Sequence, residues 1–126
     1  MMSEPIEVAA GLIFREGLLL ITQRPAGGHL AGLWEFPGGK REPGETMLQC
    51  LQRELVEELG TTVQVGLCVE TITHAYPEKT VRLEFYLCEL TEGDPSGLDS
   101  QQLAWVTPDE LDAYKFPAAD VRLLER

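Results

Sequence analysis

Apolar residues recur along this chain with two different periods, and each period predicts one kind of element. Apolar runs at 6–14 and 18–22 predict two buried strands, and Gly17 between them can take the positive φ of a tight turn, so the runs predict a hairpin. Within 80–89 the odd positions from 81 to 87 are apolar and alternate with Arg82, Glu84, Tyr86 and Cys88, which predicts one buried and one exposed face. Further strands are predicted at 62–68 and 71–76.

Helical periodicity appears between residues 45 and 59. The leucines of this segment are spaced by three or four residues, which predicts that they share one buried face of a helix. They are Leu48, Leu51, Leu55 and Leu59. Gly60 follows the last of them and predicts the C-terminal stop of the helix.

The flanking regions lack this periodicity. Residues 25–44 are rich in glycine and proline and predict a long loop, and loops of that length in compact domains often carry function. Near the C-terminus, Thr107, Pro108 and Glu110 form the cap, first residue and capping box of a helix that should run to about residue 114. A final helix is predicted to begin near Pro117.

Together these elements predict an α/β or α+β sandwich, and 126 residues have room for one domain, residues 1–126. The apolar runs are far shorter than the roughly 20 residues that cross a bilayer. The N-terminus lacks the basic start and cleavage site of a secretory signal. We therefore expect a cytoplasmic protein with no membrane partner.

The net charge of −11 narrows the range of partners, because it disfavours binding to a nucleic acid duplex. Two interpretations of the acidity remain open: a solvated surface, or carboxylates that converge on a divalent metal. The cysteines, Cys50, Cys68 and Cys88, are odd in number and lack metal-site spacing, so we expect no disulfide framework and no zinc site. All are predicted to be small core residues.

Three glutamates of the predicted helix share one face. Glu54, Glu57 and Glu58 stand at i, i+3 and i+4, within a sector about 100° wide, away from the leucines. Arg53 precedes Glu57 by four residues and is close enough to pair with it. This face is either a solvated acidic surface or a site for Mg²⁺, which prefers carboxylate oxygen. Gly38 and Gly39 upstream favour the second interpretation, because glycines let the backbone approach a metal or phosphate.

These residues follow the pattern G-x5-E-x7-R-E-U-x-E-E-x-G-U, where U is aliphatic. The matching positions are Gly39, Glu45, Arg53, Glu54, Leu55, Glu57, Glu58 and Gly60, and only Thr61 departs from the pattern. The chain therefore resembles the Nudix hydrolases, of the MutT-like kind. The resemblance extends over nearly the whole chain and implies an α/β/α sandwich around a mixed β-sheet.

The resemblance also implies roles. The Gly38 carbonyl, Glu57 and Glu58 would hold Mg²⁺, with Mn²⁺ as a possible substitute, and Glu54 would be a further ligand or the general base beside Arg53. Asp99 would add one more carboxylate, with an ordinary turn aspartate as the alternative. The implied reaction is attack of water on the β-phosphorus of a nucleoside triphosphate. It releases a monophosphate and pyrophosphate, and such enzymes clean the nucleotide pool in support of DNA repair.

The positions that match nucleoside contacts of the family are Arg24, Phe36, Tyr76, Lys79 and the segment 116–120 with Asp120. Lys40 and Arg24 are basic groups near the loop that are candidates for phosphate contacts, with ordinary surface charges as the alternative. Core packing accounts equally well for the two aromatic rings. An ionised Asp120 only accepts hydrogen bonds, which suits an exocyclic amine of cytosine or guanine, whereas the 8-oxo-dGTP-specific enzyme has asparagine there. A protonated Asp120 would donate to an oxidised purine. Both 8-oxo-dGTP and CTP or 5-methyl-dCTP therefore remain candidate substrates.

Two alternatives stay open. Another Nudix substrate is possible, namely a dinucleoside polyphosphate, a nucleotide sugar or a triphosphorylated RNA 5′ end. The other alternative is a nucleotide-binding module without catalysis, which the retained glutamates disfavour. The sequence decides neither the preferred base and sugar nor the number of metal ions, and it leaves monomer and homodimer open.

Overall fold

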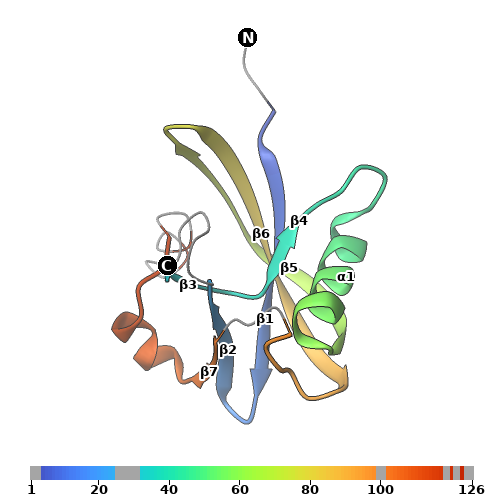
Figure 1. Cartoon of the computed structure of the whole chain (residues 1–126), viewed down its shortest axis with the longest axis vertical. Coiled ribbons are helices and arrows are strands. Elements are labelled where there is room, and N and C mark those ends of the chain that lie inside the picture. The colour runs from blue at the N-terminus through green and yellow to red at the C-terminus, as the bar shows by residue number, and fades with distance from the viewer. Residues whose placement is uncertain (1–3, 25–31, 99–101, 118–119, 121–122, 124–126) are drawn as a thin grey trace.

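The computed structural model describes residues 4–24, 32–98, 102–117, 120 and 123 (Figure 1). The elements in chain order are β1 (Ile6–Arg15), β2 (Leu18–Gln23), β3 (Trp34–Glu35), β4 (Gly38–Lys40), α1 (Met47–Leu59), β5 (Thr62–Tyr76), β6 (Lys79–Glu92), β7 (Gln102–Val106) and the 3₁₀ helix η1 (Pro108–Ala113). Among the described residues, no helix has the length and apolar character needed to span a membrane.

The strands form one mixed sheet in the order β3-β2-β1-β6-β5, with β4 paired to β1 and β7 paired to β2. The β1–β6 pair is parallel and the other pairs are antiparallel, which confirms the predicted mixed sheet. The predicted β1–β2 hairpin turns at Glu16 and Gly17, both with positive φ. The predicted long loop contains the short strands β3 and β4, and β7 has no counterpart in the sequence prediction.

Two apolar cores lie on opposite faces of the sheet. On one face α1 packs through Cys50, Leu51, Leu55 and Leu59 against residues of β1, β5 and β6. On the other face the core contains Phe36, Phe85 and Phe116, and Leu111, Tyr114 and Leu123 pack against it. This arrangement positions α1 with its buried stripe toward the sheet and its other side free for polar groups (Figure 1).

Helix α1 begins later than predicted, because Thr46 is its N-cap. The Thr46 hydroxyl accepts a hydrogen bond from the Gln49 amide, and the Gln49 side chain accepts one from the Thr46 amide. Leu48 is predicted on the buried face but is 46% exposed. The first turn meets the core through Met47 and Cys50 instead.

Two further predictions of burial were wrong. Cys68 is exposed, because it lies in an irregular stretch of β5, where the pairing with β6 shifts register on both sides of it. Strand β6 was predicted to have one exposed face, yet Tyr86 and Cys88 are buried and Leu87 is exposed. The reason is that β6 lies between β1 and β5, and α1 covers the face that carries Tyr86 and Cys88.

Candidate functional site

A cleft of about 510 Å³ lies along β1 and β4 and reaches the turn between β5 and β6. Most of the residues predicted for the site line it, namely Arg24, Phe36, Gly38, Lys40, Glu54, Glu58, Tyr76, Lys79 and Asp120. We call Gly38, Gly39, Glu54 and Glu58 the acid end of the cleft, and Arg24, Glu35 and Asp120 the Asp120 end. Arg53 and Glu57 lie outside the lining, and Asp99 falls outside the described residues.

Two glycines form the floor of the acid end. Gly38 has a φ of 151°, and a Cβ there would lie 2.0 Å from the Ala9 carbonyl oxygen on the paired strand β1. A Cβ on Gly39 would lie 2.4 Å from the carboxyl carbon of Glu54. The Glu54 carboxylate therefore rests directly on glycine backbone, an approach that no other residue type permits.

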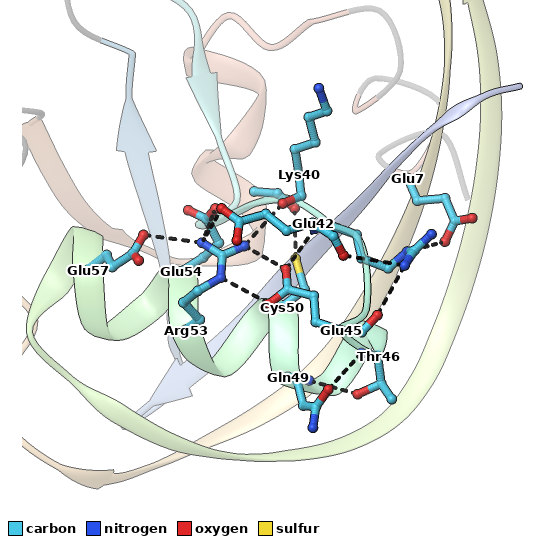
Figure 2. Close-up of polar contacts among 12 residues, drawn as sticks. Glu7, Lys40, Glu42, Glu45, Thr46, Gln49, Cys50, Arg53, Glu54 and Glu57 are labelled. Atoms are coloured by element: carbon cyan, nitrogen blue, oxygen red, sulfur yellow. Dashed lines mark hydrogen bonds and ion pairs between the residues drawn. The ribbon is translucent and has the colours of Figure 1, made fainter. Parts of the chain in front are cut away.

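Arg53 is the centre of the ion pairs around this end (Figure 2). Its Nε and Nη2 donate to the two carboxylate oxygens of Glu45 at 3.0 and 2.7 Å. Its Nη1 donates to Glu54 at 3.0 Å and to Glu57 at 3.2 Å, and its Nη2 also donates to the Lys40 carbonyl at 3.2 Å. The predicted contact with Glu57 is confirmed. The sequence reasoning missed Glu45 as the main partner of Arg53.

The electrostatics of these glutamates differ. Hydrogen bonds from Arg53, together with a backbone hydrogen bond within the Glu42–Glu45 turn, lower the pKa of Glu45 to about 2. Burial raises the pKa of Glu54, Arg53 opposes this effect, and the nearby charges of Glu57 and Glu42 add to the increase. Burial is therefore the largest influence on the pKa of Glu54, although Arg53 donates a hydrogen bond to it.

In the described part of the chain, no three acidic, histidine or cysteine side chains converge into a preformed metal cage. Arg53 separates Glu54 from Glu57, whose side chain is 57% exposed. Mg²⁺, however, commonly binds through one or two protein carboxylates and completes its shell with water and substrate phosphate. Glu54, which lies against Gly39, and Glu58, which lines the same cleft as Gly38, fit this open type of site.

At the Asp120 end, a carboxyl group is buried with little compensation. Asp120 is 5% exposed, and among the described residues its carboxyl group has no hydrogen-bond partner. Burial raises the pKa of Asp120 to about 7, repulsion from Glu35 adds to the increase, and Arg24 opposes it. Near neutral pH this carboxyl group therefore exists in both the donor and the acceptor form.

Glu35 belongs to the same end and was missed by the sequence reasoning. It lies on β3, and both of its carboxylate oxygens are 3.1 Å from the Nε of Arg24. Burial raises the pKa of Glu35, Arg24 lowers it, and Glu54 raises it. The pair places Arg24 beside two carboxyl groups. The only signal in the sequence was the position of Glu35 directly before Phe36 in the glycine-rich loop.

The two aromatic residues have different surroundings. Phe36 is buried, with its ring stacked on Phe116 at 5.4 Å and edge-on to Phe85 at 6.0 Å. It therefore packs in the core and also lines the cleft. Tyr76 is half-buried, contacts the ring of His74 at 4.7 Å and pairs with Lys79 across the turn between β5 and β6. Tyr76 presents more ring surface to the cleft than Phe36 does.

Comparisons with known proteins agree with this geometry. A family described as NUDIX domain matches residues 9–126. The 8-oxo-dGTP diphosphatase of Haemophilus influenzae is 42% identical over 122 residues, which cover 96% of this chain and 90% of that protein. The CTP pyrophosphohydrolase of Escherichia coli is 41% identical over 120 residues, which cover 95% and 89%.

Solved structures show the same fold. The solution structure of the ORF135 protein of E. coli has a TM-score of 0.82 at 40% identity and covers 97% of this chain and 87% of that one. The crystal structure of a MutT protein from Methanosarcina mazei has a TM-score of 0.88 at 27% identity and covers 100% and 95%.

Proposed function

The chain belongs to the NUDIX domain family, and on this premise we propose that it hydrolyses nucleoside or deoxynucleoside triphosphates to a monophosphate and pyrophosphate. The observation that carries the proposal is one cleft lined by Glu54, which lies against Gly39, by Glu58, and by the buried carboxyl group of Asp120. Its volume lies within the roughly 300–1,000 Å³ typical of small-molecule sites. Relatives named as 8-oxo-dGTP diphosphatase and CTP pyrophosphohydrolase support the substrate class.

The acid end is proposed to bind Mg²⁺, or Mn²⁺ in its place, through the Gly38 carbonyl, Glu54, Glu57 and Glu58. The donors are oxygen atoms, as this cation requires, and Glu57 would turn inward from its exposed position. When bound, the cation neutralises phosphate charge and activates water. Asp99 remains a proposed additional ligand.

The chain's own residues orient the reaction. Glu54, held by Arg53 at 3.0 Å and resting on Gly39, accepts the proton of the attacking water. Attack at the β-phosphorus breaks its bond to the oxygen that bridges to the α-phosphorus, so the monophosphate leaves and the new P–O bond stays in pyrophosphate. Lys40, Lys79 and Arg24 line the cleft and supply positive charge to the phosphates.

The Asp120 end is proposed to recognise the base, with Tyr76 and Phe36 forming the apolar wall. As a carboxylate, Asp120 accepts from an exocyclic amine such as that of cytosine, and as an acid it donates to an oxidised purine. The substrates favoured by this arrangement are 8-oxo-dGTP and CTP or 5-methyl-dCTP. Removal of such nucleotides would clean the precursor pool of DNA synthesis.

A nucleotide panel assayed with Mg²⁺ tests the proposal. The panel contains 8-oxo-dGTP, dGTP, dCTP, 5-methyl-dCTP and CTP, together with a dinucleoside polyphosphate, a nucleotide sugar and a triphosphorylated RNA end. We expect kcat/KM to be highest for a modified or pyrimidine triphosphate, with pyrophosphate as product. A higher value for one of the last three compounds, or orthophosphate as the product, would contradict the proposal.

A further inference from the structure

The C-terminal end of α1 receives hydrogen bonds from a segment more than 30 residues further along the chain. Residues 92–98 leave β6 and return beside the end of α1 (Figure 1). The Ser96 amide donates to the Leu59 carbonyl at 3.0 Å, and the Leu98 amide donates to the Glu58 carbonyl at 2.9 Å. A helix leaves its last carbonyls without internal donors, so this segment completes the end of α1.

Thr61 fastens the beginning of this segment. Its side chain is buried, with 1% of the residue exposed, and its Oγ1 lies 2.8 Å from the carbonyl oxygens of both Glu92 and Gly93. The hydroxyl carries one proton, which the two acceptors share. Gly93 lies so close to the helix end that a Cβ there would be 2.7 Å from the Gly60 carbonyl oxygen.

Thr61 is also the one position where the chain departs from the family pattern, which has an aliphatic residue there. An aliphatic side chain of the same shape fills the space but donates no hydrogen bond. The hydroxyl is therefore not required for packing at this position. It adds a connection between the end of α1 and the segment that covers it.

We propose that Thr61 is a positioning residue for the acid end of the cleft. Its hydroxyl holds residues 92–98 against α1, and the Ser96 and Leu98 amides in turn hold the last helical turn, which carries Glu57 and Glu58. The inference rests on the proposed role of these glutamates in binding the cation. Loss of the hydroxyl leaves two carbonyls without this donor, so the segment opens more often and the turn that presents Glu58 loses definition.

Two variants and one control isolate the hydroxyl. Thr61→Val keeps the shape and removes the donor, whereas Thr61→Ser keeps the donor. The control is Thr91→Val, because the Thr91 hydroxyl donates to the Thr62 carbonyl at 3.1 Å across the β5–β6 pair. Both valine variants remove one hydroxyl from nearly the same region.

The first measurement is amide hydrogen exchange of the metal-free protein. We expect exchange at Ser96 and Leu98 to accelerate by about tenfold in Thr61→Val and to stay near the native rate in Thr61→Ser and Thr91→Val. The second measurement is the affinity for Mn²⁺ alone, which should fall by about tenfold in Thr61→Val only. Equal loss in Thr61→Ser would assign the effect to packing of the methyl group and overturn the proposal.

The measurements distinguish a wrong cation site from a wrong role for Thr61. If the native protein binds no Mn²⁺, the proposed cation site is wrong, and the exchange data still report whether Thr61 anchors the segment. If the native protein binds Mn²⁺ and Thr61→Val binds it equally well with protected amides, the positioning role of Thr61 is wrong and the cation site stands.

Discussion

The carboxyl groups at the two ends of the cleft have different electrostatic surroundings. At the acid end, Arg53 contacts Glu45, Glu54 and Glu57, so each of these carboxylates has a cationic partner in the folded chain. At the other end, Asp120 is buried beside Glu35, and Arg24 donates to Glu35 at 3.1 Å. The ion pairs of Arg53 are formed before any ligand arrives, whereas burial is the largest influence on the Asp120 carboxyl group.

The difference separates two tasks. A compensated network fixes atom positions, which is what proton transfer and phosphate alignment need. Desolvation destabilises a buried carboxyl group until a ligand provides the complementary hydrogen-bonding group. Such a carboxyl group therefore discriminates strongly among ligands. This contrast supports the proposal that the Arg53 network serves the chemistry and that Asp120 selects the base.

The largest effect is expected from Glu54→Gln, which keeps the size of the side chain and removes its charge and basicity. Turnover should fall by about 10²- to 10⁴-fold, while nucleotide affinity changes little. Steady-state kinetics and equilibrium nucleotide binding check this, with exposed Glu89→Gln as the matched control. Unchanged turnover in Glu54→Gln would remove the acid end from the chemistry.

Asp120→Asn tests the other end. Asparagine always offers both a donor and an acceptor, so kcat/KM for 8-oxo-dGTP relative to dCTP should rise by roughly 10- to 100-fold, the range for one buried hydrogen bond. The ratio is measured with both substrates in competition. Asp112→Asn, at an exposed position of η1, is the control. An unaltered ratio would exclude Asp120 from base selection.

Glu45→Gln tests how much the orientation of Arg53 matters at the acid end, because it weakens the two hydrogen bonds between Arg53 and the Glu45 side chain. We expect kcat to fall by about tenfold with KM nearly unchanged, since orientation and not binding is lost. The control is Glu42→Gln, which removes a carboxylate 3.8 Å from the same Arg53 on an exposed side chain. Equal losses in the two variants would mean that total charge, and not the geometry of the Glu45 contact, matters.

The last prediction concerns stability and not turnover. The pKa of Asp120 is raised from 3.8 to about 7, so the folded state binds the proton more tightly than the unfolded state does. Its contribution therefore lowers stability as the pH rises from about 4 to 7, and the full cost is present above pH 7. Asp120→Asn should raise the free energy of unfolding at pH 8 by about 2–4 kcal/mol and have little effect at pH 4. Thermal melting at both pH values checks this, and a gain of equal size at pH 4 would contradict it.

The acid end could be predicted from the sequence because its parts are close together in the chain. Helical spacing alone places Glu54, Glu57 and Glu58 on one face, and it also brings Arg53 to Glu57. Gly38 and Gly39 precede this helix by a short loop. Local periodicity and a short connection therefore determine most of the acid end, although Leu48 shows that spacing does not tell which turns meet the sheet.

The Asp120 end could not be predicted from local spacing in this way. Glu35 and Asp120 are far apart in sequence, and only the pairing of β3 with β2 and the return of the C-terminal segment bring them together. Asp120 was predicted only through the family resemblance. The prediction that Cys68 is buried was wrong for a related reason. An irregular edge strand cannot be recognised from composition, because the exposure of its side chains depends on which strands pair beside it.

The position of strand β5 in the sheet also affects how copies of the chain interact in solution. It is the outermost strand of the sheet, with Leu67 75% exposed and Val69 half-exposed in its irregular stretch. The net charge of −11 makes copies of the chain repel one another at neutral pH. As carboxylates gain protons in mildly acidic solution this repulsion vanishes. The outer edge of β5 can then pair with a strand of a second molecule. Purification and storage well above that range should therefore preserve a dispersed sample.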